Sequence, residues 1–473
     1  MGKQKLVVIG AVAAGTKAAS KAQRDNPDYD VKVFTKERYI SYAGCGLPYY
    51  IGGIIKEKQE LLDSGAAKKA VVVGGGFIGL EAAENLKHRG MDVTIVELVP
   101  HILPPFDEEI ALYAEKHMVS KGVKILTGQK VTGFEGADGR VAIVKTSAGD
   151  IEADLVILSI GVRPNTGIAA EAGIEIGVTK AIKVNEYMET NIKDIYAAGD
   201  CAENTNLITR KPAWYPMGST ANKTGRIAGH NAVLENQEDV LKESLEGVLG
   251  TTIVRLFEVN AAKTGLSERD AIKEGYEIES ILVPANDRAH YFPGYKQIIT
   301  KLIVEKSTHK VLGAQVVGEG VADKPIDIIA TAITLGARVE DLAKLDLAYA
   351  PPFSMAMSST ILAANVMLNK LEGKIEVVKA AELSDKLEDG SINIIDVREE
   401  GEFFIASIPD AKNIPMNELE ARADELDKSK ETIILVCKVG KRAFLAYLKL
   451  KKLGFTNMKV LEGGTCTYPY KLV

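Results

Sequence analysis

The sequence predicts an α/β protein of several domains, and three stretches of the chain carry that prediction. A short apolar run at 5–9 is followed by the glycine turn 10–15 and a helix that reaches about residue 25. The same order returns at 70–89, where the turn 74–79 is a complete GxGxxG. An apolar run at 432–436 then opens the last of several further short α/β patterns. Strand, glycine turn and helix in this order are typical of Rossmann-like units that bind a dinucleotide, so the sequence predicts two of them.

Length and composition limit the possible functions. At 473 residues the chain can hold three or more domains, and 46% hydrophobic with 26% charged residues is ordinary for a globular protein. The net charge of −6 argues against nucleic acid or an anionic membrane as a partner. No apolar run reaches the roughly 18 residues of a membrane span. Residues 6–15 imitate a short signal peptide, but a buried strand and turn fit better because residues 16–19 continue directly into a helix.

The four cysteines are too widely spaced for a disulfide framework or a zinc site. We therefore expect no metal centre and a cytoplasmic, reducing location. Two of the four lie in motifs described below. Cys201 has the position of a buried bystander, and Cys466 lies near the chain end without a motif.

The first glycine turn has the form Gly-x-x-x-x-Gly, with Val12 in place of the middle glycine of GxGxxG. Its position between strand and helix predicts a pyrophosphate at the helix N-terminus. The next strand, 31–34, ends at Thr35 where a ribose-binding acid is expected, and Glu37 follows two residues later. Glu37 either binds the ribose from this shifted position or is a solvated loop acid. The candidate cofactor residues of this unit are Gly10, Val12, Ala13, Gly15 and Glu37.

The second glycine turn opens the helix 80–89, and the strand 92–96 that follows closes with Glu97. A carboxylate at this position accepts hydrogen bonds from both ribose hydroxyls and repels a 2′-phosphate. No arginine follows Glu97, so the sequence favours NADH over NADPH; a purely structural glycine turn is the alternative. The candidate cofactor residues of this unit are Gly74, Gly76, Ile78, Gly79 and Glu97.

Cys45 stands between two glycines, shortly before a proline that can occupy the first turn of a helix. The N–H groups of a helix start favour a thiolate. No CxxC or CxxxxC motif gives Cys45 a local partner, so its sulfur must react with a small thiol, a peroxide-derived oxygen or another protein. A buried structural cysteine is the alternative for this residue.

Cys437 follows the strand 432–436 directly and precedes a helix. A loop of this kind directs several N–H groups at the sulfur, and flanking cations, among them Lys438 and Arg442, favour an anionic sulfur further. The alternative is again a structural cysteine.

The run Ser41 to Tyr50 resembles the S-F-x-x-C-x-x-P-Y signature of coenzyme A-disulfide reductases, which are flavoproteins of the pyridine nucleotide-disulfide oxidoreductase superfamily. Tyr42 replaces the usual phenylalanine, and Gly44 replaces a frequent asparagine. The loop at Cys437 resembles a rhodanese active-site loop, with Lys438 where arginine is frequent; the run 406–411 departs from the usual Gly-His-Ile-Pro-Gly-Ala. Together they resemble the coenzyme A-disulfide reductase–rhodanese fusions, also described as NADH-dependent persulfide reductases.

This resemblance implies FAD, NADH and coenzyme A as cofactors or substrates, and it implies a homodimer. Cys45, Tyr349 and Cys437 would be catalytic, with Tyr349 of one subunit approaching Cys45 of the other. Ser41, Gly161, Gly199 and Asp200 would lie at the cofactors, Asp200 on the ribitol of FAD, while Phe77 and Glu81 would flank the nicotinamide. The implied substrate-binding residues are Lys17, Arg24, Ser41, Tyr42, Lys438 and Arg442.

The resemblance also divides the chain into domains, with a plausible linker at 370–374. The expected order is the first part of an FAD-binding domain, an NAD-binding domain, the second FAD part, an α+β dimerisation domain and a rhodanese domain, at 1–66, 67–189, 190–245, 246–370 and 375–473. Only sixteen residues separate Gly53 from Ala70, too few for the strands that the family has there. Either a segment of the chain is omitted or the deletion is real, and a real deletion puts flavin binding in doubt.

The sequence therefore predicts an FAD- and NADH-dependent reductase of coenzyme A disulfide or persulfide that works through Cys45, with a fused sulfur-transfer domain. One alternative is an NADH oxidase or peroxidase in which Cys45 cycles through a sulfenic acid. Another is a sulfur carrier that depends on Cys437 and has an inactive reductase half.

Overall fold

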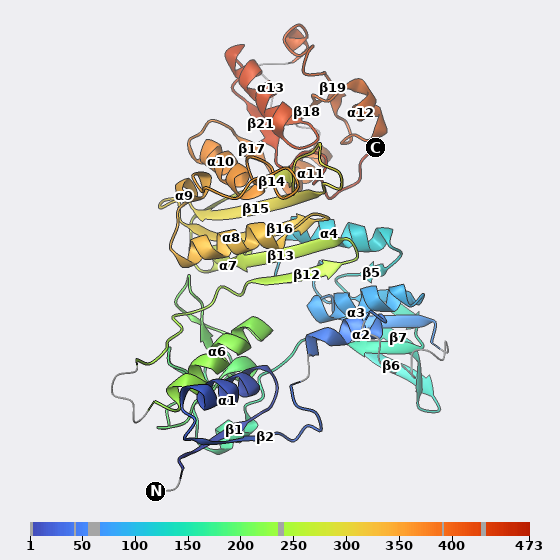
Figure 1. Cartoon of the computed structure of the whole chain (residues 1–473). Coiled ribbons are helices and arrows are strands. Elements are labelled where there is room, and N and C mark those ends of the chain that lie inside the picture. Colours follow the sequence, from blue (N-terminus) through green and yellow to red (C-terminus); the bar gives the residue numbers. More distant parts are fainter. Residues whose placement is uncertain (1–2, 42–43, 55–66, 235–240, 390–391, 427–431) are drawn as a thin grey trace. The chain divides into compact units, whose positions relative to one another are not determined.

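The computed structural model in Figure 1 describes residues 3–41, 44–54, 67–234, 241–389, 392–426 and 432–473. The chain forms two compact units, one from residues 1–66 and 160–250 and the other from residues 67–159 and 251–473. The predicted α/β class is confirmed in both. Tyr42 and the interval 55–66, on which the question of the missing segment depends, lie outside the described residues.

The first unit begins with the predicted strand, turn and helix. Strands β1 (Lys5–Ile9) and β2 (Asp30–Phe34) pair in parallel, with Lys5 opposite Asp30 and Ile9 opposite Phe34. The other elements of this unit are α1 (Ala13–Asp25), η1 (Gly44–Gly46), α2 (Leu47–Ile51), α5 (Gly167–Glu171), η2 (Gly199–Cys201), β10 (Asn204–Thr205), β11 (Pro212–Ala213) and α6 (Gly218–Asn231).

Helices α1 and α6 pack closely because small residues line their contact. A Cβ atom on Gly225 would lie 2.4 Å from the carbonyl oxygen of Ala14, and one on Gly229 would lie 2.2 Å from that of Ala18. Only glycine permits this approach at either position. Since the first glycine turn leads into α1, the packing of α1 on α6 holds this turn close to the second part of the unit, which contains α6.

The β1–β2 sheet has apolar side chains that nothing in the described chain covers. Val7, Ile9, Val33 and Phe34 are 43–68% exposed, although all four belong to a parallel sheet. Parallel sheets normally have both faces buried. The sheet therefore has the appearance of one that lacks neighbouring strands or a covering layer.

The second unit contains a parallel sheet in the order β5-β4-β3-β9, built around the second glycine turn. Strands β3 and β4 are buried along most of their length, mainly through valine and isoleucine, as expected for a sheet covered on both faces. A small antiparallel sheet, β6-β7-β8, is inserted before β9. The elements of this region are β3 (Lys69–Val73), α3 (Phe77–His88), β4 (Asp92–Val96), α4 (Glu108–Ser120), β5 (Lys124–Leu126), β6 (Val131–Ala137), β7 (Arg140–Thr146), β8 (Gly149–Glu152) and β9 (Leu155–Leu158).

The next region is an antiparallel sheet of five strands in the order β12-β13-β16-β15-β14, with α8 packed against β13 and β16. The elements are β12 (Thr252–Leu256), β13 (Val259–Gly265), α7 (Glu268–Lys273), β14 (Ile278–Asn286), β15 (Gln297–Glu305), β16 (Val311–Gly318), α8 (Asp323–Thr334), α9 (Val339–Ala343) and α10 (Ser359–Leu371).

The C-terminal region is a parallel sheet in the order β17-β21-β20-β18-β19, with a buried core that includes Val397, Leu435 and Leu450. Figure 1 places it at the red end of the chain, beyond β14 and α10. Its elements are β17 (Val377–Val378), α11 (Ala380–Asp389), β18 (Asn393–Asp396), α12 (Glu400–Ile405), β19 (Lys412–Asn413), η3 (Ala423–Glu425), β20 (Ile433–Val436), α13 (Lys441–Lys452) and β21 (Met458–Leu461).

Buried ion pairs join the C-terminal region to the rest of its unit. Nζ of Lys301, which is 1% exposed, lies 2.9 Å from Asp107 and 3.4 Å from Glu268. Glu268 in turn lies 2.7 Å from Lys379, which directly precedes α11. Lys370 lies 3.0 Å from Glu279 and 3.4 Å from Glu462.

The linker predicted at 370–374 is therefore wrong in its first part. Helix α10 continues to Leu371, and Lys370 is held by carboxylates on both sides of the junction. A sequence window around 370 does not contain these partners, which explains the error.

Candidate active sites

Cys45 lies on η1, one residue before the N-cap of α2, and its side chain is exposed. Pro48 stands in the first turn of that helix, as predicted. The backbone N–H of Ser41 donates to the carbonyl oxygen of Ala11 at 2.7 Å, which ties the approach to Cys45 to the first glycine turn. The other thiol of this unit, Cys201, donates to the carbonyl oxygen of Ala198, and burial raises its pKa.

The first glycine turn has the geometry that a bound pyrophosphate requires. Gly10 has a φ of +107°, and a Cβ on Gly15 would lie 1.9 Å from the carbonyl oxygen of Gly10. Val12 is the N-cap of α1 and Ala13 its first residue, and no side chain caps the free N–H groups there. These donors point away from the helix and suit a phosphate.

Gly199 and Asp200 lie beside this turn. A Cβ on Gly199 would lie 2.6 Å from the Cβ of Ala14. The carboxylate of Asp200 is exposed, but the atoms around it remove enough water to raise its pKa. Within the described part of the chain no hydrogen bond holds that carboxylate, so it is open to a ligand hydroxyl. The residues present at this turn thus fit the phosphates and the sugar chain of a dinucleotide such as FAD.

Several other predicted residues of this unit lie at its surface. Glu37 is exposed in the loop after β2, and only its backbone N–H makes a described hydrogen bond, to Thr35 Oγ1 at 3.2 Å. Its two interpretations therefore stay open. Gly161 adopts a φ of +96°.

The cations of α1 divide into two groups. Lys17 is half-buried, and exposed Arg24 donates to Ser20 Oγ at 2.6 Å. Lys21 is buried and lies 2.7 Å from Asp25, which also binds His230 at 2.6 Å. Lys21 is therefore part of the α1–α6 packing, and Lys17 and Arg24 remain as candidates for a phosphate-bearing substrate.

The second glycine turn is tightly closed. A Cβ on Gly74 would lie 2.4 Å from the carbonyl oxygen of Ser159, and one on Gly79 would lie 2.0 Å from that of Gly74. Helix α3 begins at Phe77, whose ring meets the edge of Phe106 at 6.2 Å, and half of the Ile78 side chain is exposed. Gly76 is the N-cap of α3 and has open space around it, and Glu81 lies half-buried on the same helix.

Glu97 lies against this turn. Its Oε2 accepts the N–H of Gly75 at 2.5 Å, and its Oε1 accepts the N–H of Val99 at 2.9 Å. The residue is 8% exposed. Each oxygen keeps a lone pair for a ligand hydroxyl, so the carboxylate braces the glycine turn and is still able to accept a further hydrogen bond.

Tyr349 is half exposed, and its hydroxyl hydrogen-bonds the hydroxyl of Tyr291. This bond raises the pKa of Tyr291. The loop that carries Tyr291 is also attached through the backbone, since Ala289 N–H donates to the carbonyl oxygen of Pro351 at 3.3 Å. Tyr291 was not predicted; the aromatic loop between β14 and β15 was the signal that could have found it.

Cys437 is buried at the end of β20, and its Sγ accepts the N–H of Ala443 at 3.3 Å. Gly440, with a φ of +88°, turns the loop into α13. Lys438 is exposed. Arg442 donates from both terminal nitrogens to Glu402 at 2.6 and 2.7 Å, so its guanidinium is already held by a carboxylate.

A second ion pair lies in the same domain. Arg398 donates to Asp396 at 2.6 to 3.0 Å through Nε and Nη2, and both residues are buried. Among the residues that the structure describes, no group of three or more metal-ligating side chains is present. No helix within those same ranges is long and apolar enough to cross a membrane.

The two glycine turns, an exposed cysteine at a helix start and a second cysteine at the N-terminal end of another helix are typical of a dinucleotide-dependent oxidoreductase joined to a sulfur-transfer domain. Family models agree with this class. Residues 52–217 match the pyridine nucleotide-disulphide oxidoreductase family, 251–361 its dimerisation domain and 379–466 the rhodanese-like domain. The chain belongs to the pyridine nucleotide-disulphide oxidoreductases, a flavoprotein family that uses FAD and NAD(P)H, and carries a C-terminal rhodanese domain.

Three similar proteins illustrate the relationship. The "NAD(P)H sulfur oxidoreductase (CoA-dependent)" of Pyrococcus furiosus is 32% identical over 449 residues, which cover 78% of this chain and all of that protein. The NAD-dependent persulfide reductase of A. fulgidus is 35% identical, with a TM-score of 0.92 over 98% of this chain and all of that one. The reduced CoADR-RHD of Bacillus anthracis is 30% identical, with a TM-score of 0.91 over the whole of both chains.

The alignment with the Pyrococcus protein contains positions that this chain does not match. Seventy-eight per cent of 473 residues is about 369, which leaves about 80 of the 449 aligned positions without a counterpart in this chain. Together with the uncovered β1–β2 sheet, this indicates that relatives hold a segment that is absent here.

Proposed function

We propose that this protein is an FAD- and NADH-dependent reductase of coenzyme A disulfide or coenzyme A persulfide, and that its rhodanese domain carries sulfur on Cys437. The observation that carries the proposal is the exposed Cys45 on a turn that Ser41 ties to the first glycine turn. The names of the similar proteins support the choice of substrate, since one is called CoA-dependent and another a persulfide reductase.

The reductase chemistry begins with the Cys45 thiolate. It attacks one sulfur of a coenzyme A disulfide, forms a mixed disulfide and releases the other coenzyme A as a thiolate. When bound, FAD supplies the electrons that NADH provides to this sulfur centre. With a coenzyme A persulfide, attack on the outer sulfur leaves a Cys45 persulfide and a coenzyme A thiolate.

Two tyrosines can provide the proton that a leaving thiolate requires. In the proposed homodimer, Tyr349 of one subunit approaches Cys45 of the other. Tyr291 hydrogen-bonds Tyr349 and can hold its hydroxyl in position. Lys17 and Arg24 are proposed to bind the phosphates of coenzyme A, with Ser41 and Tyr42 near its thiol end.

The cofactor residues are proposed in the same roles as the sequence predicted. Gly10, Val12, Ala13, Gly15, Gly199 and Asp200 would hold FAD, and Gly74, Gly76, Gly79 and Glu97 would hold NADH. Glu97 faces the glycine turn with both oxygens partly free, which favours a 2′-hydroxyl over a 2′-phosphate.

The rhodanese half is proposed to accept sulfur on Cys437. The sulfur receives one N–H donor from α13, and Lys438 is exposed beside it, so a negatively charged persulfide is stabilised there. Arg442 acts through its position rather than as a free cation, because Glu402 holds its guanidinium.

One observation favours a second candidate function. The uncovered β1–β2 sheet and the missing positions suit a chain whose flavin site is incomplete. In that case the protein is a sulfur carrier that relies on Cys437 alone, and the reductase half is inactive.

Two measurements test the two candidates. The first is the flavin content of the purified protein, and the second is NADH oxidation with coenzyme A disulfide and then with a coenzyme A persulfide. About one FAD per chain and turnover with either substrate are expected. A colourless protein that still transfers sulfur from thiosulfate favours the second candidate. NADH oxidation that needs only oxygen or peroxide favours an oxidase that cycles Cys45 through a sulfenic acid.

A further inference from the structure

The chain that follows β21 runs directly behind the Cys437 loop. We call residues 462–470 the C-terminal segment. Thr465 N–H donates to the carbonyl oxygen of Cys437 at 2.9 Å, and Cys466 N–H donates to that of Lys438 at 3.1 Å. Two successive backbone bonds therefore hold Cys466 against the loop that carries Cys437.

Glycines on both sides of this contact make it close and adjustable. Gly463 and Gly464 have φ values of +67° and +66°, and a Cβ on Gly464 would lie 2.2 Å from the carbonyl oxygen of Cys437. Gly440, on the other side, has a φ of +88°. Only glycine adopts such φ values without strain, so the close approach of the two backbones depends on these residues.

Cys466 is enclosed by the loop on one side and by α4 on the other. Its Sγ donates to the carbonyl oxygen of Gly463 at 3.2 Å. Burial raises the pKa of Cys466 to about 12; Lys438 opposes this shift and Cys437 adds to it. Tyr113 on α4 also lies close to Cys466. Burial is the main cause of the raised pKa of Tyr113, and Cys466 adds to it. The thiol is thus partly buried, and Cys437 is close enough to influence its pKa.

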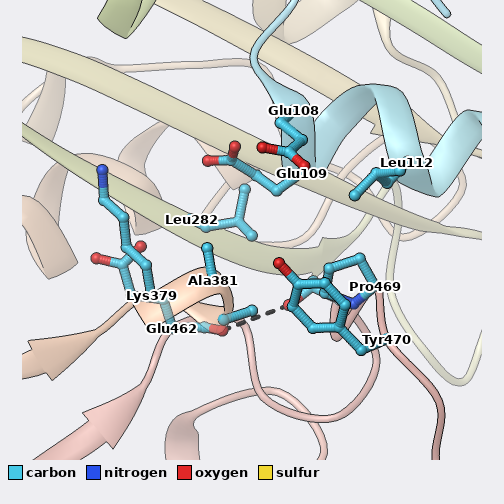
Figure 2. Close-up of a pocket in the computed structure, with 11 residues that line it drawn as sticks. Glu108, Glu109, Leu112, Leu282, Lys379, Ala381, Glu462, Pro469 and Tyr470 are labelled. Atoms are coloured by element: carbon cyan, nitrogen blue, oxygen red, sulfur yellow. Dashed lines mark hydrogen bonds between the residues drawn. The ribbon is translucent and has the colours of Figure 1, made fainter. Parts of the chain in front are cut away.

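The same helix fixes the segment in place. Nζ of Lys116 donates to the carbonyl oxygens of Tyr468 and Tyr470 at 3.0 and 3.2 Å. Figure 2 shows Pro469 and Tyr470 below the start of α4, with Glu462 on the same side of the pocket. Thr467 Oγ1 closes the turn on the carbonyl oxygen of Glu462 at 3.4 Å.

We infer that Cys466 is the resolving thiol of the rhodanese site, an inference that rests on the proposed sulfur-carrier role of Cys437. Cys466 converts a persulfide on Cys437 into a Cys437–Cys466 disulfide and releases sulfide inside the same domain. Nothing in the local sequence around Cys466 indicates this role, since the approach of the two cysteines is made by β20 and β21 side by side in the sheet.

The chemistry balances in three steps. A sulfane-sulfur donor such as thiosulfate gives one sulfur atom to the Cys437 thiolate and leaves as sulfite. The Cys466 thiolate then attacks Sγ of Cys437, the bond from Sγ to the outer sulfur breaks, and that sulfur leaves as hydrosulfide. Two coenzyme A thiols reduce the resulting disulfide and become coenzyme A disulfide, the proposed substrate of the reductase half.

Because the pKa of Cys466 is raised, the attack of its thiolate on Sγ of Cys437 should depend on pH. The groups that face Cys466 are Lys438 and Cys437 from the loop and Tyr113 from α4. Below the pKa of a thiol its thiolate fraction rises about tenfold per pH unit. Sulfide release should therefore accelerate strongly between pH 7 and pH 9.

The test uses the full chain with Cys45→Ser, so that only the rhodanese thiols react. The protein is incubated with thiosulfate without thiol or NADH, and released sulfide and the non-reduced peptides are measured. We expect about one sulfide per chain and a peptide pair that joins Cys437 to Cys466. Adding Cys466→Ser should reduce sulfide release at least tenfold and leave a persulfide on Cys437, while adding Cys201→Ser, the control, should change neither.

Two results overturn the inference. One is equal sulfide release with and without Cys466. The other is a Cys437 persulfide that persists in the parent protein with no disulfide. If Cys437 accepts no sulfur at all, the sulfur-carrier role fails by itself, and oxidation with diamide decides the pairing: a Cys437–Cys466 peptide keeps the two thiols as a redox pair, and its absence rejects them.

Discussion

The carboxylate of Glu462, the residue directly after β21, lies 3.4 Å from Nζ of Lys370 in α10, so an ion pair links the rhodanese domain to the last helix of the dimerisation region. Glu279 shares the same lysine at 3.0 Å. Lys370, the first residue of the linker expected at 370–374, is thus held by side chains on both sides of the junction. Within their shared unit, the two regions meet through buried charges rather than through a loose connection.

The first prediction concerns the titration of Glu462. Burial raises its pKa to about 7, against an ordinary value of 4.5, although Lys370 and Lys379 oppose the shift. Between these two values the folded state holds a proton that the unfolded state has lost. The stability that this group contributes is therefore complete below pH 4.5 and is lost as the pH rises towards 7, by at most about 1.4 kcal/mol per pH unit.

Glu462→Gln should flatten this dependence. Thermal unfolding of the second unit between pH 4.5 and pH 7.5 measures it, with Glu382→Gln on exposed α11 as the matched control. An unchanged slope in Glu462→Gln would show that other groups set the pH dependence.

The second prediction concerns Glu97, which binds Gly75 and Val99 through backbone N–H groups. Glu97→Ala removes both hydrogen bonds and the proposed ribose acceptor. Hydrogen bonds to a charged group are worth about 1.5–3 kcal/mol each, so kcat/KM for NADH should fall at least tenfold while that for NADPH falls less.

Glu97→Gln separates the two roles, because an amide oxygen can still accept one of the backbone N–H groups. If NADH and NADPH serve the parent enzyme equally well, Glu97 does not select the nucleotide.

The third prediction concerns Cys45. Cys45→Ser should abolish NADH-driven disulfide reduction and leave bound flavin unchanged, since the glycine turn at 10–15 does not depend on the sulfur. Absorbance of the flavin and steady-state turnover give both values from one preparation. Substantial turnover in this variant would contradict the assignment of Cys45 as the reacting sulfur.

The fourth prediction concerns the tyrosine pair. Tyr291→Phe removes the hydrogen bond to Tyr349 and leaves the ring in place. A neutral hydrogen bond contributes about 0.5–1.5 kcal/mol, so kcat should fall about threefold to tenfold, with a shifted basic limb in its pH profile. Tyr295→Phe, in the same exposed loop, is the control. A raised KM with an unchanged kcat would place Tyr291 in substrate binding instead.

The sequence predicted what depends on neighbouring residues. The strand at Lys5–Ile9, both glycine turns and the helix start near Cys45 follow from local pattern, and the structure confirms them. Contacts between distant residues were not predictable in this way: Tyr291 meets Tyr349 from another loop, Lys370 meets Glu462 from another domain, and Cys466 reaches the Cys437 loop across two strands. The roles of the predicted site residues remain predictions.

The last prediction concerns the coupling of the two halves through sulfur. Ion pairs of Lys370 and Lys379 hold the rhodanese domain within its unit. The domain is therefore not on a flexible tether, and the effective concentration that such a tether would give to Cys437 does not apply. Coenzyme A has the chemistry of a diffusible sulfur carrier between the halves, and the prediction assigns it that role. Cys437→Ala should slow NADH oxidation at least tenfold with thiosulfate plus coenzyme A, a mixture that must first load the rhodanese. It should leave coenzyme A-disulfide reduction nearly unchanged. Equal loss of both activities would make the rhodanese a structural support, and loss of neither would make the two halves independent.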